Sequence, residues 1–276
     1  MTIKQKLGAV QMATGPNVNA NLCEAERLIK EAVDGGAKLV VLPENFAFMG
    51  KHDQDQLAQR EPDGEGLLQT FLARVAKQQR IWLVGGTIPL VANDPSKVRA
   101  ACLVYNDRGE RVARYDKIHL FDVTLPGVDE RYHESATIEP GEQIVVIDSP
   151  FGRLGVVVCY DLRFPELFRT LLDAGVEVLA IPSAFTAITG KAHWETLVRA
   201  RAIENLAYVV AAAQGGFHLN GRETHGHSMI VDPWGTVLAQ VPRGRGVICC
   251  AVDREFQESI RRNFPTIHHR RLHCTF

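Results

Sequence analysis

The first part of the chain alternates between apolar runs and segments with helical spacing. Residues 6–13 (KLGAVQMA) form an apolar run typical of a strand. Residues 19–36 carry apolar side chains at helical spacing, with Asn19 as the expected N-cap and a Gly-Gly pair at the end. The segment KLVVLPE at 38–44 is dominated by an unbroken apolar run, typical of a strand buried on both faces of a sheet. The chain therefore opens with a strand, helix, strand unit.

The pattern continues with one more helix and three more strands. We expect an amphipathic helix over residues 64–80, a strand over 81–90, and two strands within 99–117 joined by a turn at 106–109. Residues 120–142 are rich in glycine, proline and charge and read as a long loop. Long loops in compact domains often carry function.

The second half repeats the alternation of strands and helices around a hairpin. The expected elements are a hairpin over residues 143–160 turning at 149–153, a helix from 164 to 175, a strand over 176–185, a helix over 192–207, a strand over 208–214, a hairpin over 227–240, a strand over 246–253 and a short terminal helix. No linker separates the two halves, so we expect one domain over residues 1–276. We predict an α/β architecture in which helices cover one face of each mixed sheet and two such layers pack back to back.

Composition narrows the class of protein. The 276 residues are 46% hydrophobic and 23% charged, which is enough apolar material for a large core. With 31 basic and 32 acidic residues the net charge is −1, so charge gives no reason to expect nucleic acid or an anionic membrane as a partner. No apolar run is long enough to span a bilayer. We therefore expect a cytoplasmic protein that acts on a small molecule.

The cysteines and histidines do not indicate a metal site. None of the six cysteines forms a C-x-x-C pair, and several lie in apolar stretches, so we expect most of them to be small core residues in a reducing compartment. The tail HHRRLHC places His268, His269, His273 and Cys274 together, but the spacing matches no zinc pattern. We expect no metal and no cofactor.

Three reactive side chains stand at the ends of predicted strands. Glu44 ends LVVLPE, Lys117 follows ARYD, and Cys159 ends the apolar run GVVVC. Reacting groups of α/β proteins gather beyond the carboxyl ends of strands, so these three side chains could converge. A thiol becomes a nucleophile when a carboxylate takes its proton, and an ammonium can stabilise the developing oxyanion. Glu44 would be the base and Lys117 the oxyanion donor, helped by the backbone N–H of Tyr160.

Each residue also has a structural alternative. Free cysteine is among the most buried residue types, and a single Glu or Lys is most often a surface charge. A Cys-His pair of the protease kind is a further alternative, with His119, His193 and His227 as possible bases. The segment around Cys159 does not match a papain-type or caspase-type cysteine motif.

The same segments resemble the nitrilase superfamily of carbon-nitrogen hydrolases. LVVLPEN resembles its glutamate motif, YDKIHLFDV its lysine motif and VVVCYDLRFPEL its cysteine motif, in the family's order. The resemblance runs over nearly the whole chain and implies a four-layer αββα sandwich. It also implies catalysis by Glu44 as base, Lys117 as oxyanion stabiliser and Cys159 as nucleophile.

The resemblance extends to further site residues. The family has a second glutamate before the cysteine motif, and Glu134 in RYHESATIEPG matches its position. Its expected role is to orient the lysine and assist proton transfer, and its structural alternatives are an exposed loop charge or an ion pair. PSAFTAITGKAHW looks like the Nit branch, which places Arg163, Phe185 and Thr189 near the substrate carboxylate. An arginine suits this task because its guanidinium can grip a carboxylate with two parallel hydrogen bonds. Its structural alternative is an ion pair with Asp161 or Glu166.

The Nit branch includes deaminated glutathione amidases and ω-amidases. The resemblance favours hydrolysis of deaminated glutathione through a thioester intermediate, which would make the protein a metabolite-repair enzyme. It also suggests a homodimer built with the helix after Cys159 and the C-terminal segment. An ω-amidase acting on 2-oxoglutaramate or succinamate is the alternative with the same chemistry. A catalytically silent scaffold of the same fold is the alternative from another class.

Overall fold

The computed structural model describes residues 5–125 and 130–272. The elements of the first half are β1 (Lys6–Gln11), α1 (Val18–Asp34), β2 (Ala37–Val41), the 3-10 helix η1 (Asp53–Gln59), α2 (Leu67–Gln79), β3 (Trp82–Val84), β4 (Ile88–Val91), β5 (Val98–Tyr105), β6 (Arg111–Asp116), β7 (Asp122–Thr124), β8 (Arg131–His133) and the 3-10 turn η2 (Glu134–Ala136).

The second half begins at a hairpin, as expected. Its elements are β9 (Val145–Ser149), β10 (Gly152–Val156), the 3-10 helix η3 (Cys159–Arg163), α3 (Pro165–Asp173), β11 (Val178–Ser183), α4 (Ala187–Asn205), β12 (Tyr208–Ala213), β13 (Gly215–Phe217), β14 (Glu223–His225), β15 (Ser228–Val231), β16 (Val237–Val241), β17 (Gly246–Ala251), α5 (Arg254–Asn263) and the 3-10 turn η4 (Thr266–His268).

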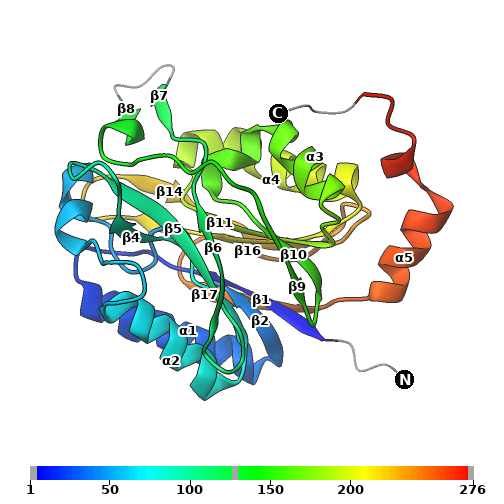
Figure 1. Ribbon diagram of the computed structural model, residues 1–276, viewed down its shortest axis with the longest axis horizontal. Helices are drawn as coiled ribbons and strands as arrows, with labels where there is room; N and C mark the ends of the chain where they lie inside the picture. The colour runs from blue at the N-terminus through cyan, green and yellow to red at the C-terminus, as the bar shows by residue number, and fades with distance from the viewer. Residues whose placement is uncertain (1–4, 126–129, 273–276) are drawn as a thin grey trace.

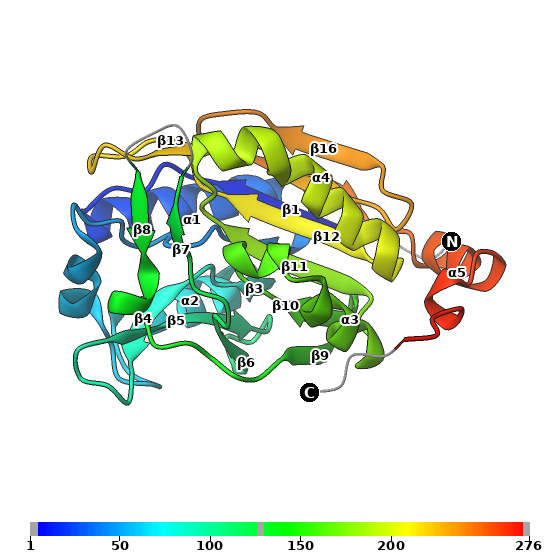
Figure 2. The ribbon, with the colours of Figure 1, turned by 90° about the horizontal axis from the view of Figure 1, so that it is seen from above.

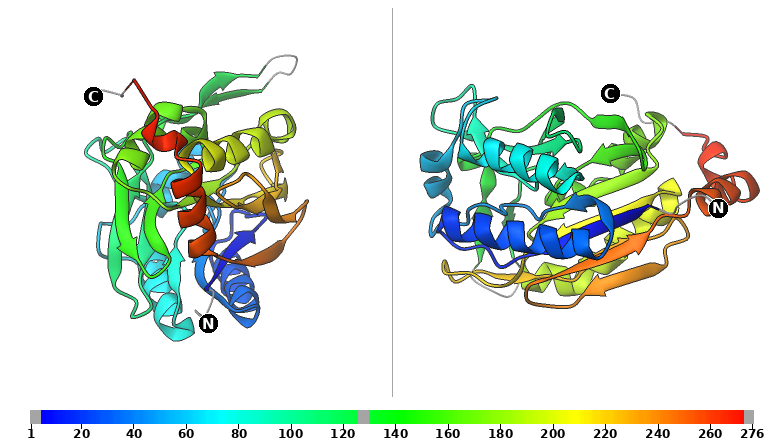
Figure 3. Two further views of the ribbon diagram at one scale, coloured as in Figure 1. Left: turned by 90° about the vertical axis from the view of Figure 1, so that its right-hand side faces the viewer. Right: turned by 90° about the horizontal axis from the view of Figure 1, so that it is seen from below.

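Two mixed sheets form the middle of the molecule (Figures 1 and 2). The first has the order β17-β1-β2-β3-β5-β4, with β6 paired to β5, and the second has the order β16-β15-β12-β11-β10-β9. Helices α1 and α2 cover the outer face of the first sheet, as the view from below in Figure 3 shows. Helix α4 covers β12 and β15 of the second sheet and packs against α3. The layers are therefore αββα, which confirms the expected fold class.

The strand β1 shows why the apolar runs are continuous. Its side chains alternate between the two faces of the sheet, as strand geometry requires. Leu7 and Ala9 belong to the core between the sheets, whereas Val10 belongs to the core beneath α1 and α2. A central strand of a four-layer sandwich is buried on both faces, so it has no polar face.

Two helix starts differ from the expectation. The N-cap of α1 is Asn17, whose side chain accepts from the N–H of Ala20, so Asn19 lies inside the helix. Helix α4 begins at Ala187, five residues before the expected start, because the Thr186 side chain caps it by accepting from the N–H of Thr189. Gly35 ends α1 as predicted.

The expected single strand over 81–90 is broken into β3 and β4. Gly86 sits at the break with a φ of 59°, and a Cβ there would lie 2.1 Å from the carbonyl oxygen of Pro43. Only glycine allows this close approach, so the bend packs directly against the segment that leads to Glu44. The next residue, Thr87, accepts a hydrogen bond from the N–H of Asn45 at 2.8 Å. The break therefore helps to position Glu44.

The expected loop over residues 120–142 contains structure. Strands β7 and β8 pair as a separate two-stranded sheet, which projects at the top left of Figure 1. In the described residues, no helix combines the length and the apolar character needed to cross a membrane.

Candidate active site

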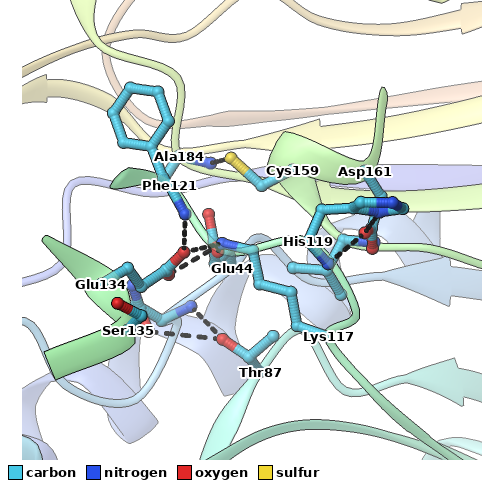
Figure 4. A network of polar contacts seen from close by, with 12 residues as sticks. Glu44, Thr87, Lys117, His119, Phe121, Glu134, Ser135, Cys159, Asp161 and Ala184 are labelled. Atoms are coloured by element: carbon cyan, nitrogen blue, oxygen red, sulfur yellow. Dashed lines mark hydrogen bonds and ion pairs between the residues drawn. The ribbon is translucent and has the colours of Figure 1, made fainter. Parts of the chain in front are cut away.

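Glu44, Lys117, Glu134 and Cys159 line one cavity (Figure 4). Glu44 lies three residues after β2, and Lys117 directly follows β6 of the same sheet. Cys159 comes from the second sheet, three residues after β10. The predicted convergence of strand ends therefore holds for these side chains.

Lys117 lies between two carboxylates. Its Nζ is 2.8 Å from Oε1 of Glu44 and 2.8 Å from both carboxylate oxygens of Glu134. The ammonium is almost fully buried, with a relative exposure of 1%, and Glu44 has 4%. The backbone N–H of Phe121 donates to Glu134 at 2.7 Å, and Gln214 donates to the backbone carbonyl of Glu44 at 2.9 Å. This network holds both carboxylates at fixed positions around the ammonium.

Cys159 occupies a strained turn. The strand β10 ends at Val156, so the expectation that Cys159 itself ends the strand is wrong by three residues. The φ of Cys159 is 49°, in the left-handed region that non-glycine residues rarely adopt. This turn directs the chain from β10 into η3, and the N–H of Ala184 lies 3.4 Å from Sγ. Strained nucleophile turns are a known way to expose a reacting atom at the end of a strand.

The charges around Cys159 keep its proton on the sulfur. Burial and the negative charge of Glu44 raise the pKa of the Cys159 thiol well above its ordinary value, although the Lys117 ammonium opposes them. Burial alone would lower the pKa of Lys117, but the carboxylates of Glu134 and Glu44 outweigh it and raise that pKa. The site therefore rests as a neutral thiol beside an ammonium with two carboxylate partners.

Glu134 also titrates away from its ordinary range. Burial and repulsion by Glu44 raise its pKa above 4.5, while Lys117 and the N–H of Phe121 act in the opposite direction. A carboxyl of this kind loses its negative charge at a higher pH than an exposed glutamate does.

Asp161 is a buried aspartate that connects two segments of the site through hydrogen bonds, a role that the sequence does not indicate. Its Oδ2 accepts from the Tyr115 hydroxyl at 2.6 Å and from the N–H of Val158 at 2.8 Å. Its Oδ1 lies 2.7 Å from Nδ1 of His119 and accepts from the N–H of the same residue at 3.0 Å. The carboxylate thus ties the segment around Lys117 to the turn that holds Cys159. The sequence alone suggests Asp161 only as an ion-pair partner for Arg163.

The three histidines that could have paired with the thiol are engaged elsewhere. His119 contacts Asp161 and stacks on Phe164 with ring centroids 3.6 Å apart. His193 lies 3.2 Å from Arg163, and the ring of His227 stacks on that of His225. Among the described residues, Glu44 and Lys117 carry the charges that shift the pKa of the Cys159 thiol, which favours the Glu44 carboxylate as its base.

The predicted substrate-binding residues line the same cavity. Arg163, Phe185 and Thr189 are all part of its wall, together with Tyr160. The Arg163 guanidinium lies over the Phe185 ring, 5.1 Å from its centroid. Within residues 5–125 and 130–272, no carboxylate lies within ion-pair distance of Arg163, so the alternative of a pair with Asp161 or Glu166 is wrong. Tyr160 is the second residue of η3, where backbone N–H groups lack acceptors within the helix.

The described residues show no group of three or more His, Cys, Asp and Glu side chains that could hold a metal ion. His273 and Cys274 of the tail lie outside the described residues.

Comparison with known proteins identifies the relatives of this chain. A deaminated glutathione amidase of Synechocystis is 43% identical over 265 residues, covering 95% of this chain and 96% of the relative. A deaminated glutathione amidase of Yersinia enterocolitica is 40% identical over 264 residues, covering 95% and 92%. The crystal structure of Saccharomyces cerevisiae Nit3, a member of branch 10 of the nitrilase superfamily, superposes with a TM-score of 0.86 at 34% identity, covering 98% of this chain and 97% of Nit3. The carbon-nitrogen hydrolase model matches residues 6–262, and the chain belongs to the carbon-nitrogen hydrolase family.

Proposed function

We propose that this protein is a cysteine-dependent amidase that hydrolyses deaminated glutathione to 2-oxoglutarate and cysteinylglycine. The observation that carries the chemistry is the buried Lys117 ammonium between two carboxylates, in one cavity with the Cys159 thiol. The substrate comes from the deaminated glutathione amidases to which the chain is similar over nearly its full length.

In the acylation step, the Glu44 carboxylate takes the proton of the Cys159 thiol. The sulfur attacks the amide carbonyl, and negative charge develops on the carbonyl oxygen. The Lys117 ammonium and the N–H of Tyr160 stabilise this oxyanion. The intermediate collapses when the leaving nitrogen receives the proton from Glu44, which releases cysteinylglycine and leaves a thioester.

In the deacylation step, Glu44 takes a proton from water, and the oxygen attacks the thioester carbonyl. The same donors stabilise the second oxyanion. Collapse breaks the carbon-sulfur bond, and the sulfur recovers its proton from Glu44 as 2-oxoglutarate leaves. Glu134 keeps Lys117 oriented in both steps through its two 2.8 Å contacts. No metal or organic cofactor enters this scheme.

The raised pKa of the Cys159 thiol fits this order of events. A thiolate at rest is not required, because Glu44 takes the proton only as the carbon-sulfur bond forms. Arg163 is proposed to hold the keto-acid carboxylate of the acyl half, since no carboxylate of the described chain pairs with it.

The substrate is tested by mixing the purified protein with deaminated glutathione and measuring 2-oxoglutarate release, with Cys159→Ala as the blank. We expect faster turnover than with 2-oxoglutaramate at equal concentration. A faster rate with 2-oxoglutaramate would make the protein an ω-amidase. A folded wild type that hydrolyses neither amide would favour the silent scaffold.

Glu134→Gln should lower kcat about 100-fold and change the pH dependence. Because the pKa of Glu134 is raised, this carboxylate loses its charge and its hold on Lys117 as pH falls through a value above 4.5. The glutamine does not titrate, so the acid limb of the kcat/KM profile should move to lower pH. Glu142→Gln, at an exposed glutamate that ends the same loop, is the matched control and should leave the profile unchanged. An acid limb that stays in place in Glu134→Gln would remove Glu134 from this role.

We further propose a cytoplasmic homodimer. The apolar residues Leu167, Phe168, Leu171 and Leu172 of α3 are buried within the chain itself, so they do not support an interface. Trp234 and Phe264 support one better, because they are 55% and 48% exposed and their rings contact each other at 5.4 Å. Light scattering at several concentrations measures the oligomeric state.

A further inference from the structure

A row of aromatic rings connects two arginines along the cavity wall. The Arg163 guanidinium lies 5.7 Å from the Tyr160 ring centroid. Tyr160 contacts Phe121, and Phe121 contacts Tyr132, each with ring centroids 5.0 Å apart. The Arg222 guanidinium lies 5.0 Å from the Tyr132 ring centroid. All five side chains line the cavity, so it has an apolar wall with a cation at each end.

The two arginines differ in their partners. In the described part of the chain, Arg163 has no carboxylate partner within ion-pair distance. Arg222, directly before β14, has one, because its Nη2 lies 2.7 Å from Oδ1 of Asp53 at the start of η1. Both side chains of this pair are partly exposed, at 37% and 42%. Asp53 therefore engages one nitrogen of the guanidinium, and the other N–H groups of this planar donor remain for a second carboxylate.

We propose that Arg222 binds the carboxylate of the amine half of the substrate, which makes it a specificity-determining residue for long amides. This inference rests on the proposed function. Deaminated glutathione carries one carboxylate at its keto-acid end and another on the glycine of its leaving half. With the first carboxylate at Arg163, the other arginine of the same cavity, Arg222, is placed to receive the glycine carboxylate.

A substrate of this size is long enough to run along the aromatic row. Its outer rings, Tyr160 and Tyr132, are separated by two steps of 5.0 Å, so their centroids lie at most twice that distance apart. An extended chain of three residues spans about 10 Å. Deaminated glutathione has this length, and its methylene groups would lie along the half-buried rings between the two arginines.

A short amide gains nothing from Arg222. The leaving group of 2-oxoglutaramate is ammonia, which has no carboxylate and does not extend along the aromatic row. The Arg222–Asp53 pair then stays as it is in the free protein. A substrate with a glycine carboxylate instead adds a charge-assisted hydrogen bond to the guanidinium. Arg222 should therefore act on KM for the long substrate alone.

The experiment compares Arg222→Met with Arg74→Met on two substrates. Arg74 is a matched control because it also pairs with a carboxylate, that of Glu26, at similar exposure, and lies 5.5 Å from the centroid of the Phe71 ring, while neither Arg74 nor Glu26 lines this cavity. We expect Arg222→Met to raise KM for deaminated glutathione about tenfold or more, with kcat retained and 2-oxoglutaramate kinetics unchanged. Arg74→Met should leave the kinetics of both substrates unchanged, and Arg222→Lys should recover part of the loss.

A modified substrate tests the same contact in the wild type. Deaminated glutathione with its glycine carboxylate converted to the amide should show the raised KM with the wild type and no further rise with Arg222→Met. An equal effect of Arg222→Met on the long and short substrates, or no effect of the amide substitution, overturns the inference alone. A wild type that does not hydrolyse deaminated glutathione overturns the proposed function together with it.

Discussion

Replacing Cys159 by alanine is expected to abolish amide hydrolysis, with a loss in kcat on the order of 10⁴-fold or more. Without the sulfur no thioester can form, and water would have to attack the amide directly. Arg163, Phe185 and the Lys117 network stay in place, so the variant should still bind substrate with nearly unchanged affinity. Single-turnover product release and calorimetric substrate binding measure the two quantities separately.

Two further variants make this result specific. Cys159→Ser replaces the thiol by a hydroxyl, a nucleophile of higher pKa, at the same turn and should retain little activity. Cys102→Ala removes another fully buried thiol from β5, outside the cavity wall, and should keep full kcat. If Cys159→Ala that is free of contaminating enzyme still hydrolyses the substrate at a substantial rate, the hypothesis that the Cys159 sulfur is the nucleophile is rejected.

Lys117→Met should damage stability and activity together. The substitution leaves the carboxylates of Glu44 and Glu134 facing each other in a buried site without their shared cation. Breaking a buried ion pair from one side destabilises a protein by about 3–5 kcal/mol. Loss of an oxyanion donor lowers kcat by about 10²- to 10³-fold. Urea unfolding and steady-state kinetics at neutral pH measure the two effects.

The pH dependence of stability distinguishes this explanation from a simple packing defect. A carboxyl whose pKa is raised in the folded protein favours folding while it is protonated, and this contribution is lost as pH rises. The pKa of Glu134 is raised already beside Lys117, and removing the ammonium raises it further. The deficit of Lys117→Met relative to wild type should therefore shrink as pH falls. A deficit that stays constant from neutral to acidic pH would contradict the electrostatic origin, and Lys38→Met, at an exposed lysine of β2, should show none.

The convergence of Glu44, Lys117 and Cys159 could be predicted because strand ends are visible in the apolar pattern. Glu44 and Cys159 closely follow apolar runs, Lys117 directly follows a strand of mixed polar and apolar residues, and the sheet topology brings these ends to one region. The αββα layers were predictable for the same reason, since continuous apolar runs indicate strands covered on both faces. The second glutamate, Glu134, depended on the family resemblance, because the charged loop around it has no periodic signal.

Other features depend on contacts that no local pattern encodes. The break at Gly86 arises from the approach of the Pro43 carbonyl, which is distant in sequence. Asp161 contacts Tyr115 in β6 and His119 just after it, which belong to the seven-stranded sheet and the segment that follows it. An aspartate close to an arginine in the sequence does not indicate such contacts with a distant segment. Arg222 reaches the cavity from the turn before β14 and was missed for the same reason.

The proposed base and nucleophile stand on different sheets. Glu44 and Lys117 follow strands of the seven-stranded sheet, whereas Cys159 follows β10 of the six-stranded sheet. A partly denatured form that kept the hydrogen bonds of each sheet but lost the docking between them would have native-like circular dichroism and no aligned reacting groups. Enzymatic turnover therefore reports whether the two sheets are packed against each other, and under mild denaturation it should disappear before the secondary structure does.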